Sequence, residues 1–363
     1  MKKICFLIGN INHSGGTERV TTLIANELSK SNYQVTILSL WDGDQPFFSL
    51  EDGIDFFSLF PQKISMRKFF FPAVLKIRQF CIDHQIDTLV VVDSISCVFT
   101  VPALLGLNIN HVCWEHFNLK VNLGSRFRDL GRWMAAKWCD KIITLTERDK
   151  EFWDKKFGLA SVNKVIAIAN PSPFPLQDHV PSLEYKNILC VGRLTYQKGF
   201  DLLIPAWAKI ADSLVDWKIT IVGAGEDEEM LKQMAIDYNV DQSIDFVGQQ
   251  KNMDQFYRAA SIFCMSSRFE GLPMVLLEAQ SYGLPIISFD CDTGPSQIVE
   301  NEVNGYLVEP LNIQELSNKL LLICNISLDK YKRIIGYSKN KSKNFSLEKA
   351  LKDWVDIIKA DLK

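Results

Sequence analysis

Short apolar runs alternate with longer segments of helical spacing along this chain of 363 residues. In Glu18–Lys30, for example, the apolar residues Val20, Ile24 and Leu28 recur with the period of a helix. Repeated strand–helix units form a parallel sheet covered by helices, so the chain is predicted to be an α/β protein. The expected strands are Ile4–Ile8, Val35–Leu40, Thr88–Val92, His111–Trp114, Lys141–Leu145, Val165–Ala169, Ile188–Val191, Trp217–Val222, Ser243–Val247, Ser261–Met265, Pro285–Phe289 and Gly305–Val308.

The alternation is interrupted at Asn170–Pro175, where three prolines fall within five residues. Proline continues neither a helix nor a central strand, so this segment is interpreted as a linker. We therefore expect two Rossmann-like, doubly wound domains, residues 1–170 and 171–345, and a last helix over 346–363. Ligands of such sheets bind at the carboxyl ends of the strands, so both domains are expected to face one cleft. The apolar face of the last helix contains Leu347, Leu351, Trp354, Val355, Ile358 and Leu362.

The composition, with 47% hydrophobic and 23% charged residues, is that of a soluble globular protein with a full core. The net charge of −3 gives no general attraction to nucleic acid. The apolar run Ile4–Ile8 is shorter than the roughly 7–15 residues of a signal-peptide core, and no run of about 18 apolar residues predicts a membrane helix. The nine cysteines form no CxxC pair, which favours reduced, buried thiols of a cytosolic protein over disulfides or a zinc site.

Two cations flank the turn Gly192–Gly199, which follows the first strand of the second domain. Arg193 offers a forked guanidinium and Lys198 a compact ammonium, and both are expected at the start of a helix. Two cations in this position suit a diphosphate. The alternative is that both are solvated surface charges.

The segment Ser266–Ser296 contains two carboxylates, Glu270 in a polar loop and Glu278 inside an apolar helix. Eight helical residues span roughly 12 Å, whereas hydrolytic carboxylate pairs are about 5–9.5 Å apart. Two different tasks on one ligand fit this spacing better than a glycosidase pair. If Glu278 is buried it needs a polar partner, and a ribose diol and an arginine are the alternatives.

Two features of the first domain also lie at expected carboxyl ends of strands. Gly15 and Gly16 begin a helix, where backbone N–H groups and the helix dipole favour an anion. The alternative is an ordinary turn between a strand and a helix. His116 follows the strand His111–Trp114, and this position favours a role in the site over a purely structural one.

Two other patterns are interpreted as structural. Gly223 and Gly225 follow a strand, but Glu228 replaces the third glycine of the dinucleotide fingerprint, and the neighbouring acids would repel phosphate. Asp290 and Asp292 match the Asp-x-Asp pattern of metal-dependent sugar-nucleotide enzymes. The two cations of the turn can neutralise a diphosphate themselves, so no metal is expected.

Two segments of the first domain combine basic and aromatic residues. Pro61–Ile82 has five basic residues, three consecutive phenylalanines and no acid. Ser125–Trp138 has four basic residues and two tryptophans against one acid. This mixture suits an anionic membrane surface, and the alternative is a charged helix face above its core stripe.

Together these motifs resemble those of the retaining glycosyltransferases of family 4. The stretch Phe269–Pro273, followed by Glu278, is similar to the family's E-x7-E signature. The turn Gly192–Gly199 and the shorter motifs of the chain occur in the family's order, and the resemblance covers almost the whole sequence. These shorter motifs are Gly15-Gly16, Trp114-Glu115-His116 and Asn304–Val308. The resemblance implies the GT-B fold, in which a last helix crosses back to the first domain.

The resemblance also implies roles for single residues. Arg193 and Lys198 would hold the diphosphate of a nucleotide-sugar donor, for which the family favours a UDP-sugar, while Glu278 would hold its ribose. Glu270 would hold the donor sugar, and His116 would lie beside the reacting carbon. The catalytic set is His116, Arg193, Lys198 and Glu270. The donor set is Gly16, Gly192, Arg193, Lys198, Glu270, Gly271, Leu272, Pro273 and Glu278, and the acceptor set is Gly15, Gly16 and His116. Family members generally need no metal, so neither a metal nor a cofactor is expected.

Family members of this kind often build bacterial capsule, O-antigen, lipopolysaccharide or teichoic glycans. The implied activity is transfer of a hexose or N-acetylhexosamine to a lipid-linked saccharide, by a cytoplasmic enzyme peripheral to the inner face of the membrane. The alternatives are a GT-B enzyme with a soluble acceptor, a nicotinamide oxidoreductase and a non-catalytic nucleotide-sugar-binding module. The basic Phe-rich segment disfavours the first, the broken glycine fingerprint the second, and the intact site residues the third.

Overall fold

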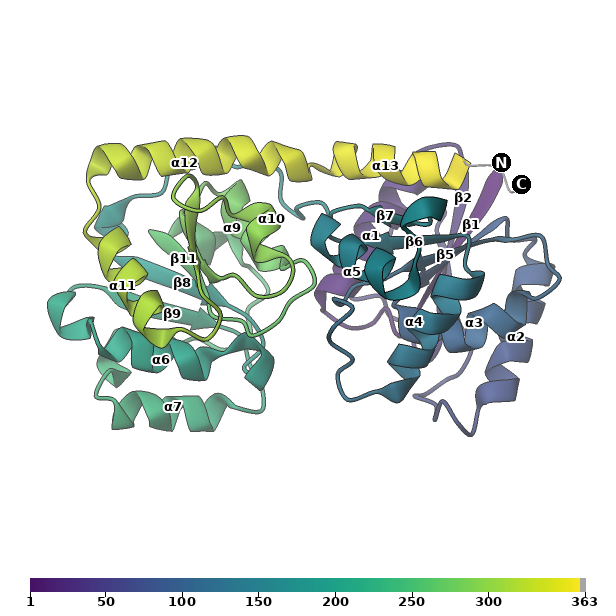
Figure 1. Cartoon of the computed structure of the whole chain (residues 1–363), viewed down its shortest axis with the longest axis horizontal. Helices are drawn as coiled ribbons and strands as arrows, with labels where there is room; N and C mark the ends of the chain where they lie inside the picture. The colour runs from purple at the N-terminus through teal and green to yellow at the C-terminus, as the bar shows by residue number, and fades with distance from the viewer. Residues whose placement is uncertain (360–363) are drawn as a thin grey trace. The chain divides into compact units, whose positions relative to one another are not determined.

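The computed structural model describes residues 1–359 and divides into two compact units (Figure 1). Unit 1 comprises Met1–Pro173 together with the segment from Leu347 on, and unit 2 comprises Phe174–Ser346. The division falls between Pro173 and Phe174, inside the proline-rich segment. Each unit has its own parallel sheet, and the two are described separately.

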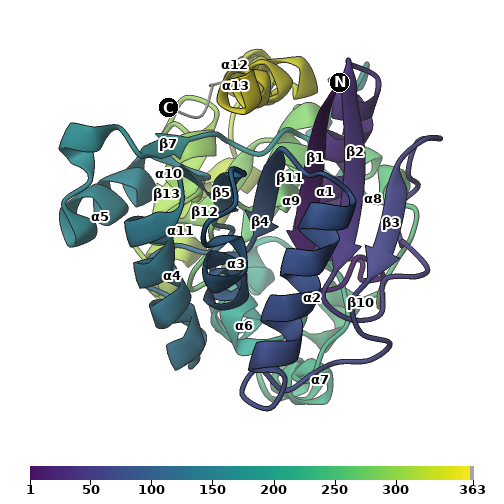
Figure 2. The same ribbon diagram turned by 90° about the vertical axis from the view of Figure 1, so that its right-hand side faces the viewer.

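Unit 1 is built on a seven-stranded sheet in the order β3-β2-β1-β4-β5-β6-β7, and all its pairings are parallel. Figure 2 shows β1, β2 and β3 side by side. The edge strand β3 was not predicted from the sequence; its two apolar side chains, Phe56 and Phe57, are exposed, as are Asp55 and Ser58. The strands are β1 (Lys2–Ile8), β2 (Tyr33–Ser39), β3 (Asp55–Ser58), β4 (Thr88–Val92), β5 (Asn110–Trp114), β6 (Lys141–Thr144) and β7 (Val165–Ala167).

Helices cover both faces of this sheet, because strands buried on both sides carry apolar side chains in both directions. One face packs on α2 to α5 around residues such as Leu7, Ile77 and Trp153. The helices of unit 1 are α1 (Gly16–Ser29), α2 (Phe70–Asp83), α3 (Cys97–Leu104), α4 (Arg126–Trp138), α5 (Glu147–Phe157) and α13 (Leu347–Lys359).

The last helix, α13, packs on unit 1. The ring of Trp354 lies 4.6 Å from that of Trp114 and 6.0 Å from that of Phe6, measured between centroids. Lys2 Nζ donates to the carbonyl oxygen of Ile358 at 3.1 Å. Trp354 and Ile358 are buried, in line with their place on the predicted apolar face, whereas Leu362 lies outside the described residues.

Unit 2 repeats the architecture with a six-stranded parallel sheet in the order β10-β9-β8-β11-β12-β13. The strands are β8 (Asn187–Val191), β9 (Lys218–Val222), β10 (Ile244–Phe246), β11 (Ile262–Met265), β12 (Ile286–Phe289) and β13 (Gly305–Val308). The helices are α6 (Phe200–Ala208), α7 (Glu228–Asp237), α8 (Asp254–Arg258), α9 (Met274–Ser281), α10 (Pro295–Ile298), α11 (Ile313–Cys324) and α12 (Leu328–Ser342). In both sheets the strand order first runs outward on one side of the first strand, β1 or β8, and then continues on its other side. Ligands of such folds bind at the carboxyl ends of the strands next to this switch point.

All nine cysteines are buried and free, as the sequence analysis predicted. Among residues 1–359, no helix combines the length and the apolar character that a membrane crossing requires.

Candidate active site

The turn after β8 brings together a cation and a carboxylate that are far apart in the sequence. Lys198 Nζ lies 2.6 Å from Glu270 Oε1, and their side chains are 18% and 8% exposed. The stem of Lys198 passes over Gly192, where a Cβ atom would lie only 3.2 Å from it. Gly192 therefore lets the lysine lie flat against the turn, with its ammonium group beside Glu270.

Arg193, on the same turn, is exposed. Within residues 1–359 its side chain forms neither a hydrogen bond nor an ion pair. The turn thus presents one guanidinium that is open to a ligand and one ammonium group that is already on a carboxylate. This arrangement can receive an anion without first breaking an Arg193 contact.

The glycines Gly223 and Gly225 pack directly against the backbone of this turn. A side chain at Gly223 would overlap the carbonyl oxygen of Gly192, and one at Gly225 would overlap that of Leu194. The backbone of Leu194 also donates to the carbonyl oxygen of Ala224 at 3.0 Å. Their role in packing agrees with the structural interpretation from the sequence.

A second loop holds Glu270 in place. Thr293 is buried, and its hydroxyl donates to the carbonyl oxygen of Glu270 at 2.6 Å. Gly294, at φ +98°, lies against Gly271 and Pro273, where a side chain would collide. The segment 293–295 therefore supports the loop from Glu270 to Pro273, and α9 begins directly after that loop.

Glu278 is buried on α9, and its partner was not predicted. The Tyr257 hydroxyl donates to Glu278 Oε2 at 2.6 Å. Tyr257 itself is buried and stacks on Tyr282, with ring centroids 5.0 Å apart. Tyr257 is neither of the partners that the sequence left open, a ribose diol or an arginine. Because α8 is only five residues long, its spacing gave no signal that Tyr257 faces α9.

In unit 1, Gly15 and Gly16 stand at the start of α1. Gly15 is the N-cap residue, and a side chain there would collide with the carboxylate of Glu18. The absence of a side chain at Gly15 lets Glu18 fold back over the helix start. Gly16 is exposed. An acid at this helix end competes with a bound anion for the same positive dipole, which weakens the predicted phosphate role of these glycines.

His116 follows β5 and is only 8% exposed. Its ring is tilted against that of Trp114 at 4.5 Å between centroids. Burial lowers the pKa of His116 to about 4, so the imidazole is neutral near pH 7. Its Nε2 atom is buried without a hydrogen-bond partner in the described residues. A buried nitrogen of this kind is suited to a ligand hydroxyl.

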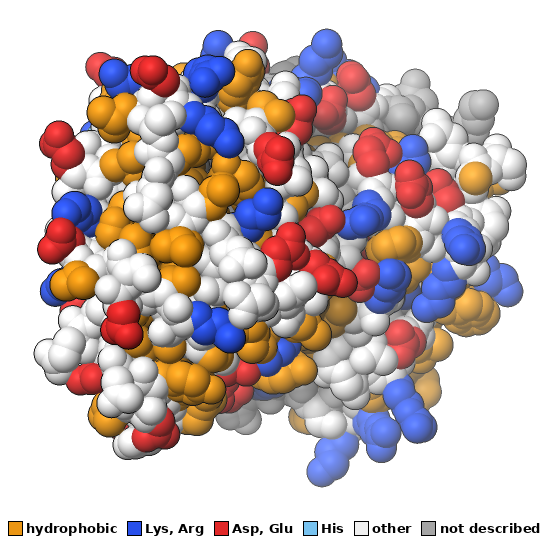
Figure 3. Space-filling view, turned by 60° about the vertical axis from the view of Figure 1, so that its left-hand side comes forward, with side chains coloured by type: hydrophobic (Ala, Val, Ile, Leu, Met, Phe, Trp, Pro, Cys, Tyr) orange, Lys and Arg blue, Asp and Glu red, His pale blue; other side chains and the backbone are white. Residues whose placement is uncertain are grey.

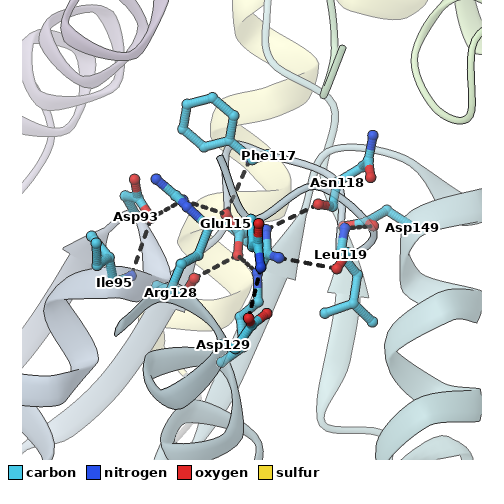
Figure 4. A network of polar contacts seen from close by, with 12 residues as sticks. Asp93, Ile95, Glu115, Phe117, Asn118, Leu119, Arg128, Asp129 and Asp149 are labelled. Carbon is cyan, nitrogen blue, oxygen red and sulfur yellow. Dashed lines mark hydrogen bonds and ion pairs between the residues drawn. The ribbon is translucent and has the colours of Figure 1, made fainter. Parts of the chain in front are cut away.

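A network of buried charges lies beside His116 and was not predicted (Figure 4). Arg132 Nε donates to Glu115 Oε2 at 2.8 Å, and Arg128 Nη1 donates to Asp93 Oδ1 at 2.6 Å. Both arginines belong to the segment Ser125–Trp138, whose basic residues were predicted to suit an anionic membrane surface, with an exposed charged helix face as the alternative. That expectation was wrong for these two, because both are paired with carboxylates in the interior.

Cys97, His111 and Cys139 form the one group of potential metal ligands found in residues 1–359. The Cys139 sulfur lies 3.6 Å from His111 Nδ1 and 3.8 Å from Nε2, and the two thiols are 4.0 Å apart. A shared metal would lie in the ring plane along one nitrogen lone pair, which would leave the sulfur far from the other nitrogen. The near-equal distances from the sulfur to the two ring nitrogens instead place the sulfur against the ring. We therefore interpret the two cysteines and the histidine as side chains packed in the core.

Two family models match the chain, "Glycosyltransferase Family 4" over residues 14–171 and "Glycosyl transferases group 1" over residues 176–341. The chain is 38% identical to an uncharacterized glycosyltransferase of Haemophilus influenzae, with 99% of this chain and 100% of the relative covered. It is 30% identical to the amylovoran biosynthesis glycosyltransferase of Erwinia amylovora, with the same coverage. A Campylobacter jejuni N-acetyl-D-galactosaminyltransferase whose name specifies an undecaprenol-linked acceptor is 26% identical, with 99% and 98% covered.

The fold has solved counterparts. A crystal structure of the Anabaena protein HepE in complex with UDP and glucose matches with a TM-score of 0.83 at 20% identity, and the match covers 99% of this chain and 100% of that one. At this identity the likeness supports the fold alone. The relatives and the family models go further: the chain belongs to the glycosyltransferases, with the GT-B fold, a Family 4 domain in its first half and a group 1 domain in its second.

Proposed function

We propose that this glycosyltransferase transfers a hexose or N-acetylhexosamine, with retention of configuration, from a UDP-sugar to a lipid-linked saccharide of a bacterial surface polysaccharide. The observation that carries the proposal is the turn after β8. Arg193 and Lys198 suit the two phosphates of a nucleotide-sugar, and Glu270 beside Lys198 suits the hydroxyl groups of its sugar. This supports a donor site in unit 2.

Glu278 extends the same site to the nucleoside. Its carboxylate, held by the Tyr257 hydroxyl at 2.6 Å, suits a ribose diol, whose hydroxyls would donate to it. The backbone from Gly271 to Pro273 precedes α9 and lies next to Glu270, so it suits the sugar–phosphate junction. We assign none of residues 1–359 to recognition of the base. The uridine assignment is supported by the UDP bound in the structurally similar HepE.

The chemistry we propose is electrostatic. As the bond between the anomeric carbon and the diphosphate oxygen breaks, charge grows on the diphosphate, and Arg193 and Lys198 stabilise it. The acceptor hydroxyl attacks from the same face, and its proton passes to the leaving phosphate oxygen. His116, neutral at pH 7, donates or accepts a hydrogen bond to a sugar hydroxyl through Nε2. The two cations supply the charge that a metal would otherwise provide, so the proposal includes no metal.

The lipid-linked acceptor is supported by an exposed face of unit 1. On and before α2, the basic residues Lys63, Arg67 and Lys68 are exposed beside Phe71, which is 75% exposed. On α4, the Lys137 ammonium lies 5.4 Å and 4.7 Å from the ring centroids of the exposed Trp133 and Trp138. Figure 3 shows a group of Lys and Arg side chains at its lower right, mixed with apolar ones. Basic and aromatic side chains together suit an anionic lipid surface, and this supports a cytoplasmic enzyme bound to the inner face of the membrane.

The burial of Arg128 and Arg132 also leaves the second candidate open, a GT-B transferase with a soluble acceptor, because it removes two charges from the presumed membrane face. Flotation with vesicles decides between them. We expect the protein to float with anionic vesicles at low salt and not with neutral ones. Lys63 and Lys68 changed together to Glu should abolish flotation, since each basic residue contributes about 1 kcal/mol. The same changes at Lys155 and Lys156, on α5, are the control.

The activity itself is tested by nucleotide release. Purified protein is incubated with a panel of nucleotide-sugars and a membrane extract that supplies lipid-linked saccharides. Acceptor-dependent release of UDP, with growth of the saccharide by one sugar, is the expected result. Release of no nucleotide from any donor would contradict the proposal, and formation of the inverted anomer would contradict retention.

A further inference from the structure

The loop 115–119, which carries His116, is held by one buried guanidinium from α4 (Figure 4). Arg132 Nε donates to Glu115 Oε2 at 2.8 Å. Its terminal nitrogens donate to the carbonyl oxygens of Leu119 at 3.0 Å and of Asn118 at 2.9 Å. The Arg132 side chain is fully buried, so these charge-assisted bonds form away from water, where they are strongest. One side chain therefore fixes both ends of the loop.

Two carboxylates hold the backbone N–H groups of the same loop. Glu115 Oε1 accepts from Phe117 N–H at 3.1 Å, and Asp149 Oδ1 accepts from Leu119 N–H at 2.8 Å. Ser94 also donates to Glu115 Oε2, at 2.6 Å. Backbone N–H groups and backbone carbonyl oxygens of the loop are thus both hydrogen-bonded, which leaves His116 little freedom to move.

Gly131 allows α4 to pack close enough for the Arg132 guanidinium to reach the loop 115–119. A side chain at Gly131 would overlap the carbonyl oxygen of Ser94, so α4 approaches the 3₁₀ turn Ser94–Ser96 more closely than any other residue would allow. Arg128 and Arg132 lie one turn apart on either side of this contact. Arg128 reaches Asp93, whose φ of +81° is uncommon for a residue with a side chain. Strained backbone of this kind is retained where the surrounding structure fixes it, often at functional sites.

We propose that Arg132 is a positioning residue for His116 in the transfer reaction. This inference rests on the proposed function and deepens it. Arg132 bonds the backbone on the far side of His116 and the side chain of the residue before it, and it does not bond the imidazole itself. A hydrogen bond from His116 to a sugar hydroxyl depends on the position of this backbone, and a displacement of about 1 Å can cost about 100-fold in rate.

The test compares Arg132→Met and Arg132→Lys with the wild type in the nucleotide-release assay. We expect kcat to fall about 100-fold in Arg132→Met, with the dissociation constant of the donor unchanged, because the residues proposed to hold its diphosphate and ribose, Arg193, Lys198 and Glu278, lie in unit 2. Arg132→Lys keeps the charge beside Glu115 but lacks the fork that reaches two carbonyls, so it should restore only part of kcat. Lys155→Met, an exposed change on α5, is the matched control and should behave as the wild type.

A purely structural role for Arg132 is distinguished by a double-mutant cycle. If Arg132 acts through His116, Arg132→Met should lower kcat little further in a His116→Ala background. The same loss in both backgrounds, or a wild-type kcat in Arg132→Met, would overturn the proposal. Should Arg132→Met fail to fold, Glu115→Gln with Arg132→Met leaves no unpaired buried charge and carries the same test.

The proposal also has a readout that needs no activity, which separates its failure from that of the proposed function. Hydrogen exchange at Leu119 N–H and the NMR signals of the His116 imidazole report the loop directly. Faster exchange and shifted His116 signals in Arg132→Met, and not in Lys155→Met, are expected even if no nucleotide-sugar is turned over. Unchanged exchange and signals would overturn the positioning role.

Discussion

The two units place charged groups at the carboxyl ends of their strands in opposite ways. In unit 1, Glu115 and Arg132 are fully buried and bond to each other and to nearby backbone. In unit 2, Arg193 is exposed, and Lys198 has one carboxylate partner and is partly open to solvent. Both units use basic side chains beside a carboxylate, but Arg132 holds the protein's own backbone, whereas Arg193 and Lys198 can still receive a ligand. Burial and the number of partners separate the two roles.

The largest expected effect comes from breaking the unit 1 pair. Glu115→Leu leaves two arginines with reduced compensation in the interior, and removing one partner of a buried pair costs about 3–5 kcal/mol of stability. The measurement is urea unfolding monitored by fluorescence. The matched control is Glu151→Leu, an exposed acid on α5, which should change stability by less than about 0.5 kcal/mol. Equal unfolding midpoints for the two variants would show that the buried pair does not hold unit 1 together.

Breaking the unit 2 pair should act chiefly on rate. Lys198→Ala removes one of two cations from the leaving diphosphate, so we expect kcat to fall by about 10²–10³-fold, the usual effect of losing one group that stabilises developing charge. The melting temperature should fall less than in Glu115→Leu, because Lys198 is partly exposed. Lys186→Ala, which removes a surface ion pair with Asp216, is the control. A full transfer rate in Lys198→Ala would make the assignment of this turn wrong.

A smaller effect is expected at Tyr257, whose contact with Glu278 was not predicted. Tyr257→Phe removes one hydrogen bond to the Glu278 carboxylate, and bonds to charged groups contribute about 1.5–3 kcal/mol. We expect the KM for the donor to rise about tenfold with kcat nearly unchanged, because the ribose is not the reacting part. Tyr238→Phe, at an exposed tyrosine, should leave both constants as they are. An unchanged KM in Tyr257→Phe would argue against a ribose on Glu278.

The last prediction concerns pH dependence rather than a single rate or binding constant. Burial raises the pKa of Asp149 to about 7 from its ordinary 3.8, so the folded chain holds this proton more tightly than the unfolded chain between these values. The contribution of Asp149 to stability therefore falls as pH rises from about 4 to about 7. Asp149→Asn keeps the acceptor for Leu119 N–H and does not titrate. Its unfolding free energy should decline less over this range than that of the wild type, and identical profiles would show that Asp149 does not titrate as described.

The sequence predicted those parts of the molecule that depend on local pattern. Alternating apolar runs identified the strands, and the prolines at 171–175 marked the place where the chain passes from one unit to the other. The edge strand β3, which has four residues, all of them exposed, was not predicted. The sequence identified Lys198 and Glu270 as site residues, but their 2.6 Å contact depends on packing between segments 72 residues apart.

The buried charges of unit 1 were missed for the same reason. Arg128 and Arg132 lie among polar and aromatic residues on α4, and nothing in this spacing shows that α4 turns this face toward Glu115. One signal was present: Gly131, between the two arginines in the interior of a predicted helix, indicates a close approach of another segment. Tyr257 carried no such signal. Contacts between distant segments are thus the part that periodicity alone does not reveal.

The central claim is that the turn after β8 holds a diphosphate. Calorimetric titration with a nucleoside diphosphate and its monophosphate tests it most directly, using the base that stabilises the protein most in a thermal-shift screen. The account predicts that the wild type binds the diphosphate more tightly by at least about tenfold, and that Arg193→Met with Lys198→Met removes this preference while monophosphate binding remains. Equal binding of the two nucleotides by the wild type, or a preference that survives the double substitution, would contradict it.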